Sequence, residues 1–177
     1  MMLPTAYRWL ADEPGPRMLV EGVKLHGTIE LPGNADSPTL LAWAREVGLD
    51  RVYTHDSIPW CGLFMALCAH RATWELPEGP LWALNWAKWG TSEDVPMLGD
   101  VMTFQRHGGG HVAMYVGEDE THWHILGGNQ SDRVCIIRRS KPDLYAARRA
   151  PWRHAQPANV RRVMLKNTGA PTGVSEA

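Results

Sequence analysis

One of the three cysteines in the chain, Cys61, has the setting of a reactive thiol. It follows Pro59 and stands near the start of an apolar run, residues 60–72, whose composition predicts a buried helix. In the first turn of a helix, a thiol meets the positive end of the dipole and free backbone N–H groups, which favour the thiolate. The same N–H groups can bind an oxyanion. The indicated chemistry is nucleophilic attack on a carbonyl carbon.

The other two cysteines lack this setting. Cys68 lies two turns into the predicted helix and Cys135 lies in a predicted strand, so both are expected to be small core residues. Three cysteines cannot form a disulfide framework, and an odd count fits folding in a reducing cytoplasm. No CxxC pair occurs, so no zinc site is indicated. We expect no metal and no cofactor.

A cysteine nucleophile needs a base that is near it in space rather than in sequence. Of the eight histidines, His111 is the best placed, because it follows the glycines 108–110 and opens a strand-like run. Glycines at that point leave room for a substrate over the imidazole. His55 and His70 are rivals: His55 lies in the loop before the helix, and His70 lies two turns past the cysteine. His107 stands across the glycine run and is expected only to frame it.

A third group must orient the base. The next strand-like run ends in Asn129 and Gln130. An amide at this point can hold the second ring nitrogen of His111 and fix its tautomer, as in Cys-His-Asn arrangements. Asn129 is the first choice. Gln130 is the alternative, because strand alternation makes the choice depend on register.

The first half of the chain is predicted to be helical after an irregular, proline-rich arm at residues 1–16. Ser37 and Pro38 give a typical helix start, and Gly48 gives the stop. Apolar residues at helical spacing support the assignment. The predicted helices lie at about 17–26, 38–47, 60–72 and 80–89.

The second half is predicted to form an antiparallel meander, with short apolar strands joined by turns at 101–104, 111–117, 123–126 and 134–138. Helices followed by strands is the order of an α+β domain. The acidic residues 118–120 are expected to form a solvated turn. His122 and His124 are expected at exposed positions of a half-buried strand. Residues 153–177 turn polar and predict a loosely held tail.

Four stretches, taken in this order, resemble the NlpC/P60 and CHAP superfamily of papain-like peptidoglycan hydrolases, at residues 56–64, 98–104, 110–117 and 126–130. The nearest pattern is that of a phage and prophage group that shares the WC, GHV and LGGNQ blocks. The resemblance covers about residues 17–152, the predicted catalytic domain. It implies a papain-like α+β fold, in which the helix with Cys61 packs on the sheet with His111. Gly62 departs from the pattern, since members often carry Ala or Ser there.

The resemblance also implies an activity: hydrolysis of an amide bond in the peptide part of peptidoglycan, by an endopeptidase or an N-acetylmuramoyl-L-alanine amidase. By matching position it implies Cys61 as nucleophile, His111 as general base and Asn129 as the third polar residue. Asp56 and Trp60 match the block before the nucleophile, and we expect them to shape the cleft.

The net charge and the distribution of apolar residues limit the kinds of partner that the chain can have. The net charge of -1 does not indicate a nucleic-acid partner. No run approaches the roughly 18 apolar residues that a bilayer span needs, and the start lacks the regions of a signal peptide. We therefore expect a protein made in the cytoplasm that acts in the periplasm or cell wall. A pore-forming protein, a phage tail or a secretion system would deliver it.

Other classes of function stay open. The same residues would serve a phage lysin, a tail-associated enzyme, or an amidase effector that acts on the wall or on another acyl substrate. Neighbouring genes would separate these. A non-enzymatic alternative is a wall-binding module on an inactive scaffold. Fast alkylation of Cys61 relative to Cys68 and Cys135 would argue for catalysis.

Overall fold

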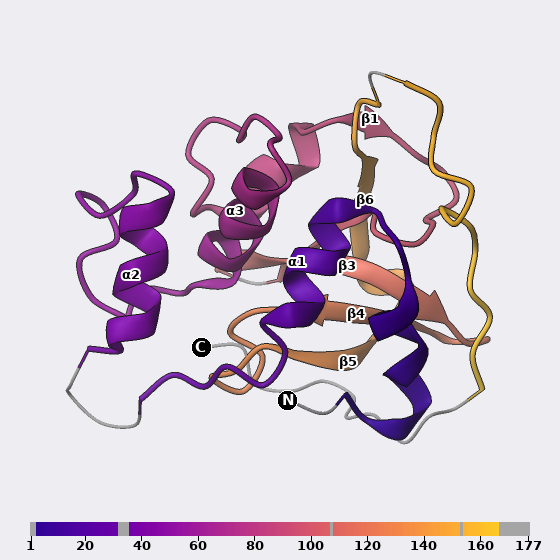
Figure 1. The fold of residues 1–177 in the computed structure, drawn as a ribbon, viewed down its shortest axis with the longest axis horizontal. Coiled ribbons are helices and arrows are strands. Elements are labelled where there is room, and N and C mark those ends of the chain that lie inside the picture. Colours follow the sequence, from indigo (N-terminus) through magenta and orange to yellow (C-terminus); the bar gives the residue numbers. More distant parts are fainter. Residues whose placement is uncertain (1–2, 32–35, 107, 153, 167–177) are drawn as a thin grey trace.

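The computed structural model describes residues 3–31, 36–106, 108–152 and 154–166. The fold is α+β, with α1 and α3 packed on one face of a six-stranded antiparallel sheet (Figure 1). The α-helices are α1 (Arg17–Lys24), α2 (Pro38–Glu46) and α3 (Cys61–Arg71), and the 3-10 helices are η1 (Thr5–Asp12), η2 (Ala83–Lys88) and η3 (Lys141–Asp143). The strands are β1 (Thr91–Ser92), β2 (Val101–Arg106), β3 (Gly109–Glu118), β4 (His122–Gly127), β5 (Cys135–Ser140) and β6 (Leu144–Arg149).

The central helix is α3, and every residue from 61 to 69 is buried. Its apolar composition is that of a helix enclosed on all sides. Helix α1 approaches it and the sheet closely at Gly22. A Cβ there would lie 2.5 Å from Cε of Met114 and 3.2 Å from Cζ of Phe64. Glycine at this position therefore allows α1, α3 and the sheet to share one core.

The sheet has the strand order β1-β6-β2-β3-β4-β5. Strands β2 to β5 form the expected antiparallel meander. Strand β6 was not predicted; it returns to pair with β2 and β1. Its buried Arg149 forms ion pairs with Asp100 at 2.8 Å and Glu93 at 2.9 Å. A strand that buries a paired arginine lacks the apolar alternation by which sequence patterns reveal strands.

The two faces of β3 contact different cores. Val112 and Met114 pack with α3 in the larger core, whereas Ala113 and Tyr115 belong to a smaller cluster. This separation follows from strand alternation. His111, on the same side as Ala113 by this alternation, is paired with Phe104 of β2. His111 is the third residue of β3, next to the glycines at the strand end that lines the Cys61 pocket.

Three segments differ from the sequence expectations. The arm contains η1, whose Tyr7 and Leu10 are buried. The predicted helix at 80–89 is the shorter 3-10 helix η2. The described part of the predicted tail is held to the body, because Val160 is buried and Glu118 and Met164 form a β-bridge. Apolar side chains in otherwise polar stretches explain why both ends of the chain pack. Residues 153 and 167–177 of the predicted tail lie outside the described residues.

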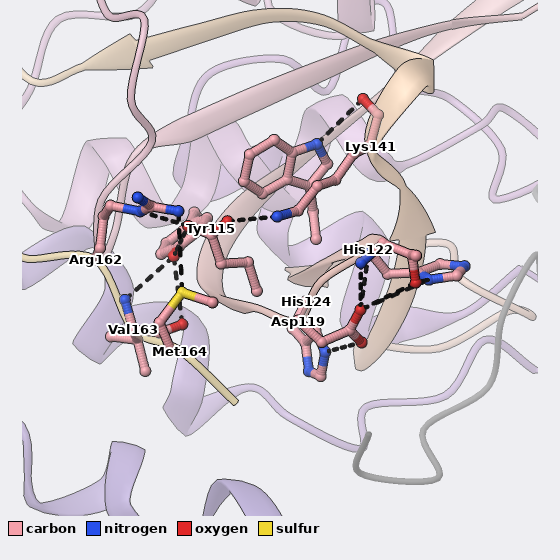
Figure 2. A network of polar contacts seen from close by, with 11 residues as sticks. Tyr115, Asp119, His122, His124, Lys141, Arg162, Val163 and Met164 are labelled. Atoms are coloured by element: carbon pink, nitrogen blue, oxygen red, sulfur yellow. Dashed lines mark hydrogen bonds and ion pairs between the residues drawn. The ribbon is translucent and has the colours of Figure 1, made fainter. Parts of the chain in front are cut away.

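Two of the three acidic residues at the end of β3, Glu118 and Asp119, are buried, contrary to the expected solvated turn. Glu118 is 1% exposed and accepts hydrogen bonds from Lys141 at 2.6 Å and Arg162 at 2.8 Å. Figure 2 shows this network where the C-terminal segment meets the sheet. Burial raises the pKa of Glu118, but the bonds from Arg162 and Lys141 outweigh it, so its pKa is lowered. The carboxylate thereby ties β3 to the chain beyond residue 160.

Asp119 and His124 form a second part of the same network. Asp119 Oδ2 lies 3.0 Å from Nε2 of His124 and 2.8 Å from Nε of Arg138. Because a carboxylate only accepts, His124 donates from Nε2, and its Nδ1 accepts from the hydroxyl of Tyr7 at 2.7 Å. His124 is fully buried, which corrects the expectation of an exposed position. The network fastens η1 to β4.

None of the helices in the described ranges is long and apolar enough to cross a membrane.

Candidate active site

Cys61 is the first residue of α3 and lines a pocket of about 610 Å³. The N-cap residue, Trp60, makes no capping hydrogen bond through its side chain, and the first turn contains no acidic residue. The positive end of the helix dipole therefore meets no compensating carboxylate from its own first turn. An anionic sulfur or oxyanion is favoured at this point.

Gly62 lies where the structure leaves no room for a side chain. A Cβ at this position would lie 2.3 Å from the carbonyl oxygen of Leu81 and 2.6 Å from that of Pro80. The backbone of residues 80–81, which lines the Cys61 pocket, therefore passes directly over Gly62. Alanine or serine would push this wall away from the helix.

The glycine run before His111 forms another wall of the pocket. Gly108, Gly109 and Gly110 all line it together with Cys61. A Cβ at Gly110 would lie 2.6 Å from Cδ2 of Leu84, so the strand end approaches η2 as closely as a glycine allows. Among the described residues that line the pocket, Gly110 is therefore the neighbour of the predicted base.

His111 itself is 1% exposed and is not among the pocket-lining residues of the described chain. Its ring centroid lies 6.5 Å from that of Phe104. The imidazole is therefore almost fully buried, and its backbone neighbour Gly110 lines the pocket. A ligand in the pocket would contact the backbone of these glycines.

The amide that contacts His111 belongs to Gln130. Its Oε1 lies 3.0 Å from Nε2 of His111, and its Nε2 donates to the carbonyl of Cys135 at 2.6 Å. Because the carbonyl of Cys135 can only accept, the amide orientation is fixed, and Oε1 must accept from His111. The proton of the neutral imidazole is therefore on Nε2, which leaves the ring lone pair on Nδ1.

Asn129, the first choice from the sequence, makes no hydrogen bond with His111 in the described chain. It adopts a positive φ of 56°, and its buried Oδ1 has no hydrogen-bond partner. Asparagine tolerates this left-handed conformation better than most residues. The strand ends here, so its alternation no longer applies. Gln130 then folds back over Gly127, where a Cβ would lie 2.8 Å from Oε1 of Gln130.

Trp60 is a buried support for the segment that carries Cys61 and does not line the pocket within the described chain. It is fully buried, and a Cβ at Gly128 would lie 2.7 Å from its ring. Its indole Nε1 donates to Oε2 of Glu30 at 2.5 Å. Desolvation raises the pKa of Glu30, in spite of the opposing hydrogen bond from Trp60. No local sequence pattern indicates the role of Glu30, because its hydrogen-bond partner Trp60 lies 30 residues further along the chain.

Asp56 is also a support. Its Oδ2 accepts from the backbone N–H of Ser37 at 2.7 Å, and its own N–H donates to Oδ1 of Asp36 at 3.0 Å. These reciprocal bonds join the start of α2 to the loop before α3. Neither Asp56 nor Trp60 lines the pocket within the described chain, so their expected role in shaping the cleft becomes one of holding the nucleophile segment.

The remaining candidates lie elsewhere. Cys68 is fully buried, and desolvation strongly raises the pKa of its thiol. Burial also raises the pKa of Cys135. His55 is exposed and contacts Asp36, and His70 is exposed near the end of α3. His107 lies outside the described residues. No cluster of three or more His, Cys, Asp or Glu side chains in the described ranges could hold a metal ion.

No family model matches the chain. No curated protein matches it in sequence.

Proposed function

We propose that the protein is a papain-like cysteine hydrolase that cleaves an amide bond in the peptide part of bacterial peptidoglycan. The observation that carries the proposal is Cys61 at an uncapped helix N-terminus in a pocket. The adjoining strand end carries His111, which is oriented by Gln130. This is the order of groups that a cysteine nucleophile requires: thiol, imidazole, orienting amide.

The mechanism uses the tautomer that Gln130 imposes. Nδ1 of His111 accepts the proton of the Cys61 thiol, and the thiolate attacks the amide carbonyl carbon. The backbone N–H at the start of α3 stabilises the resulting oxyanion. The imidazolium then protonates the leaving amine as the C–N bond breaks. Water, activated by the neutral imidazole, hydrolyses the thioester and restores the thiol.

The walls of the pocket favour small apolar groups beside the scissile bond. Four apolar side chains line it: Val52, Ile58, Leu81 and Trp82. Val52 is 60% exposed and Trp82 is 58% exposed, so both present apolar surface to a ligand. The alanine methyl groups of a peptidoglycan stem fit such walls. Arg106 also lines the pocket.

The test is digestion of purified peptidoglycan by the wild-type protein and by Cys61→Ala, with mass spectrometry of the soluble products. Cys68→Ala is the matched control, since it removes a buried thiol from the same helix. We expect fragments from the wild type and Cys68→Ala, and none from Cys61→Ala. Equal release by Cys61→Ala would rule out this nucleophile.

Delivery to the wall is part of the proposal, by a pore-forming protein, a phage tail or a secretion system. If folded protein with a reduced Cys61 releases nothing from peptidoglycan, an effector that cleaves another acyl substrate takes precedence. Alkylation with iodoacetamide then separates an enzyme from a wall-binding module. A catalytic Cys61 reacts at neutral pH faster than Cys68 does, and more slowly after His111→Ala.

A further inference from the structure

A second pocket adjoins the Cys61 pocket, and we call it the Trp74 pocket. Its volume is about 750 Å³, which is within the range of small-molecule sites. Gly79 and Asn85 line both pockets. Nδ2 of Asn85 donates to the carbonyl of Gly79 at 3.0 Å, so this pair forms the shared edge. A ligand bound at Cys61 can therefore continue over Gly79 into the Trp74 pocket.

The Trp74 pocket contains a rigid aromatic surface. Trp74 packs edge-to-face on Trp89, with ring centroids 6.4 Å apart, and on Trp152 at 5.6 Å. Trp89 is fixed in turn by its Nε1, which donates to the carbonyl of Glu75 at 2.9 Å. Trp74 remains partly exposed. An indole held in this way presents an apolar face without further ordering, and the C–H face of a pyranose ring can stack on it.

The polar groups of this pocket are available to a ligand. Glu75, Glu78 and Lys88 are exposed, and their side chains make no hydrogen bond or ion pair within the described chain. The Asn85 side chain donates a hydrogen bond from its Nδ2 to the carbonyl of Gly79. Two carboxylates and one ammonium form a mixed set of donors and acceptors. Such a set suits the hydroxyl and acetamido groups of an uncharged sugar better than it suits a strongly charged ligand.

We propose that the Trp74 pocket is a sugar-binding subsite for the N-acetylhexosamine chain of peptidoglycan. The choice of this sugar rests on the proposed function; the pocket itself does not depend on catalysis. Because the two pockets share an edge, a sugar at Trp74 places the amide bonds nearest the glycan at Cys61. The protein then cleaves the lactyl–L-alanine bond or the bond after it, rather than a remote cross-bridge.

The first test measures binding without hydrolysis. The wild-type chain is titrated with chitotetraose, a peptide-free N-acetylglucosamine tetramer, by isothermal titration calorimetry. We expect saturable binding that weakens at least about tenfold in Trp74→Ala and in Glu78→Ala/Lys88→Ala. Glu120→Gln, at an exposed glutamate outside the pocket, should bind as the wild type does. The double variant changes only exposed side chains, so it stays informative if Trp74→Ala misfolds.

The outcomes separate the subsite from the proposed function. Chitotetraose binding that depends on the pocket supports the subsite even if no peptidoglycan is cleaved. The subsite is overturned if the wild type does not bind the tetramer, if it binds only a glycan-free stem peptide, or if the pocket variants bind equally well. In an active protein, the double variant should raise KM for glycan-linked stems and leave KM for free stem peptides unchanged. Equal KM values for both substrates in the wild type would contradict the proposal.

Discussion

The side-chain amide of Gln130 bridges the start of β3 and the start of β5. Its Oε1 lies 3.0 Å from Nε2 of His111 on β3, and its Nε2 donates to the carbonyl of Cys135 on β5. The carbonyl fixes the orientation of the amide, and the amide fixes the tautomer of the imidazole. The lone pair on Nδ1 of His111 is thus a consequence of a backbone carbonyl on β5, two strands away in the sheet.

Replacing Gln130 by alanine is therefore expected to lower kcat by at least about tenfold, while KM changes less. The loss should stay below the ~10⁴-fold effect of enforcing the wrong tautomer in a serine protease triad. Gln130→Glu should instead shift the acidic limb of the pH–rate profile upward, because a carboxylate beside the imidazole raises the pKa of His111. Steady-state kinetics across pH on a soluble wall fragment measures both effects.

The matched control for this prediction is Asn129→Gly. Glycine accepts the positive φ of 56°, and the removed Oδ1 has no hydrogen-bond partner. Activity close to that of the wild type is expected. A large loss of activity in Asn129→Gly, together with a small loss in Gln130→Ala, would indicate that Asn129 rather than Gln130 orients His111.

The sequence predicted the elements whose apolar spacing is strong. Helices α2 and α3 and strands β2 to β5 lie close to their expected positions. Strand β6 was missed because its six residues, LYAARR, bury an arginine that is neutralised by Asp100 and Glu93. Such pairing depends on residues about 50 positions away and leaves no periodic trace. Asp119 and His124 are only five residues apart, but their buried network also depends on Tyr7 and Arg138 from other segments.

The candidate site was predictable to the level of segments and not of single side chains. Cys61 at a helix start and His111 at a strand start both follow from local patterns. The choice between Asn129 and Gln130 depended on one backbone dihedral, the positive φ of Asn129, which ends the alternation. Glu30 and the Trp74 pocket arise from contacts between distant segments, for which one sequence contains no local signal.

Gly62 gives a prediction about stability. In Gly62→Ala, the new methyl group meets the carbonyl oxygens of Leu81 and Pro80, so helix and loop must separate. Overpacking of this kind costs about 1–3 kcal/mol. Urea denaturation should show that loss of unfolding free energy, and activity should fall because the displaced loop lines the Cys61 pocket.

Gly109→Ala is the control for Gly62→Ala, since a Cβ there has no atom within 4 Å. Its unfolding free energy should change by less than about 0.5 kcal/mol. If the unfolding free energy of Gly62→Ala changes as little, the backbone of residues 80–81 is not a fixed wall of the pocket.

Glu30 gives a prediction about the support of the nucleophile. Glu30→Ala leaves the buried indole N–H of Trp60 without its acceptor, at a cost of about 1–3 kcal/mol. Glu30→Gln retains an acceptor oxygen and should lose less. Thermal unfolding compares the two. Equal losses in both variants would indicate that the carboxylate charge, rather than the hydrogen bond, is what Trp60 requires.

The pair Asp119–His124 predicts acid sensitivity in two pH windows. Burial lowers the pKa of His124, more than the bond from Asp119 raises it. The unfolded chain therefore binds a proton that the native state rejects, and stability falls as pH drops below about 6.5. Burial raises the pKa of Asp119, but bonds from His124, Thr121 and Arg138 lower it further, so its net pKa is depressed. Its contribution is present above about pH 3.9 and is lost below that value.

Urea denaturation at pH 7.5, 5.5 and 3.5 tests these windows. Between pH 7.5 and 5.5 the wild type should lose unfolding free energy, and His124→Gln should lose less over the same interval, because it has no proton to take up at this site. His70→Gln, at an exposed position on α3, should follow the wild type. Protonation of Nδ1 of His124 removes the acceptor of the Tyr7 hydroxyl, whose proton must then turn elsewhere. We therefore expect faster amide exchange in η1 at pH 5.5 than at pH 7.5, after correction for the intrinsic rates. Unchanged protection of η1 across this interval would mean that Tyr7 is held to the sheet independently of the charge on His124.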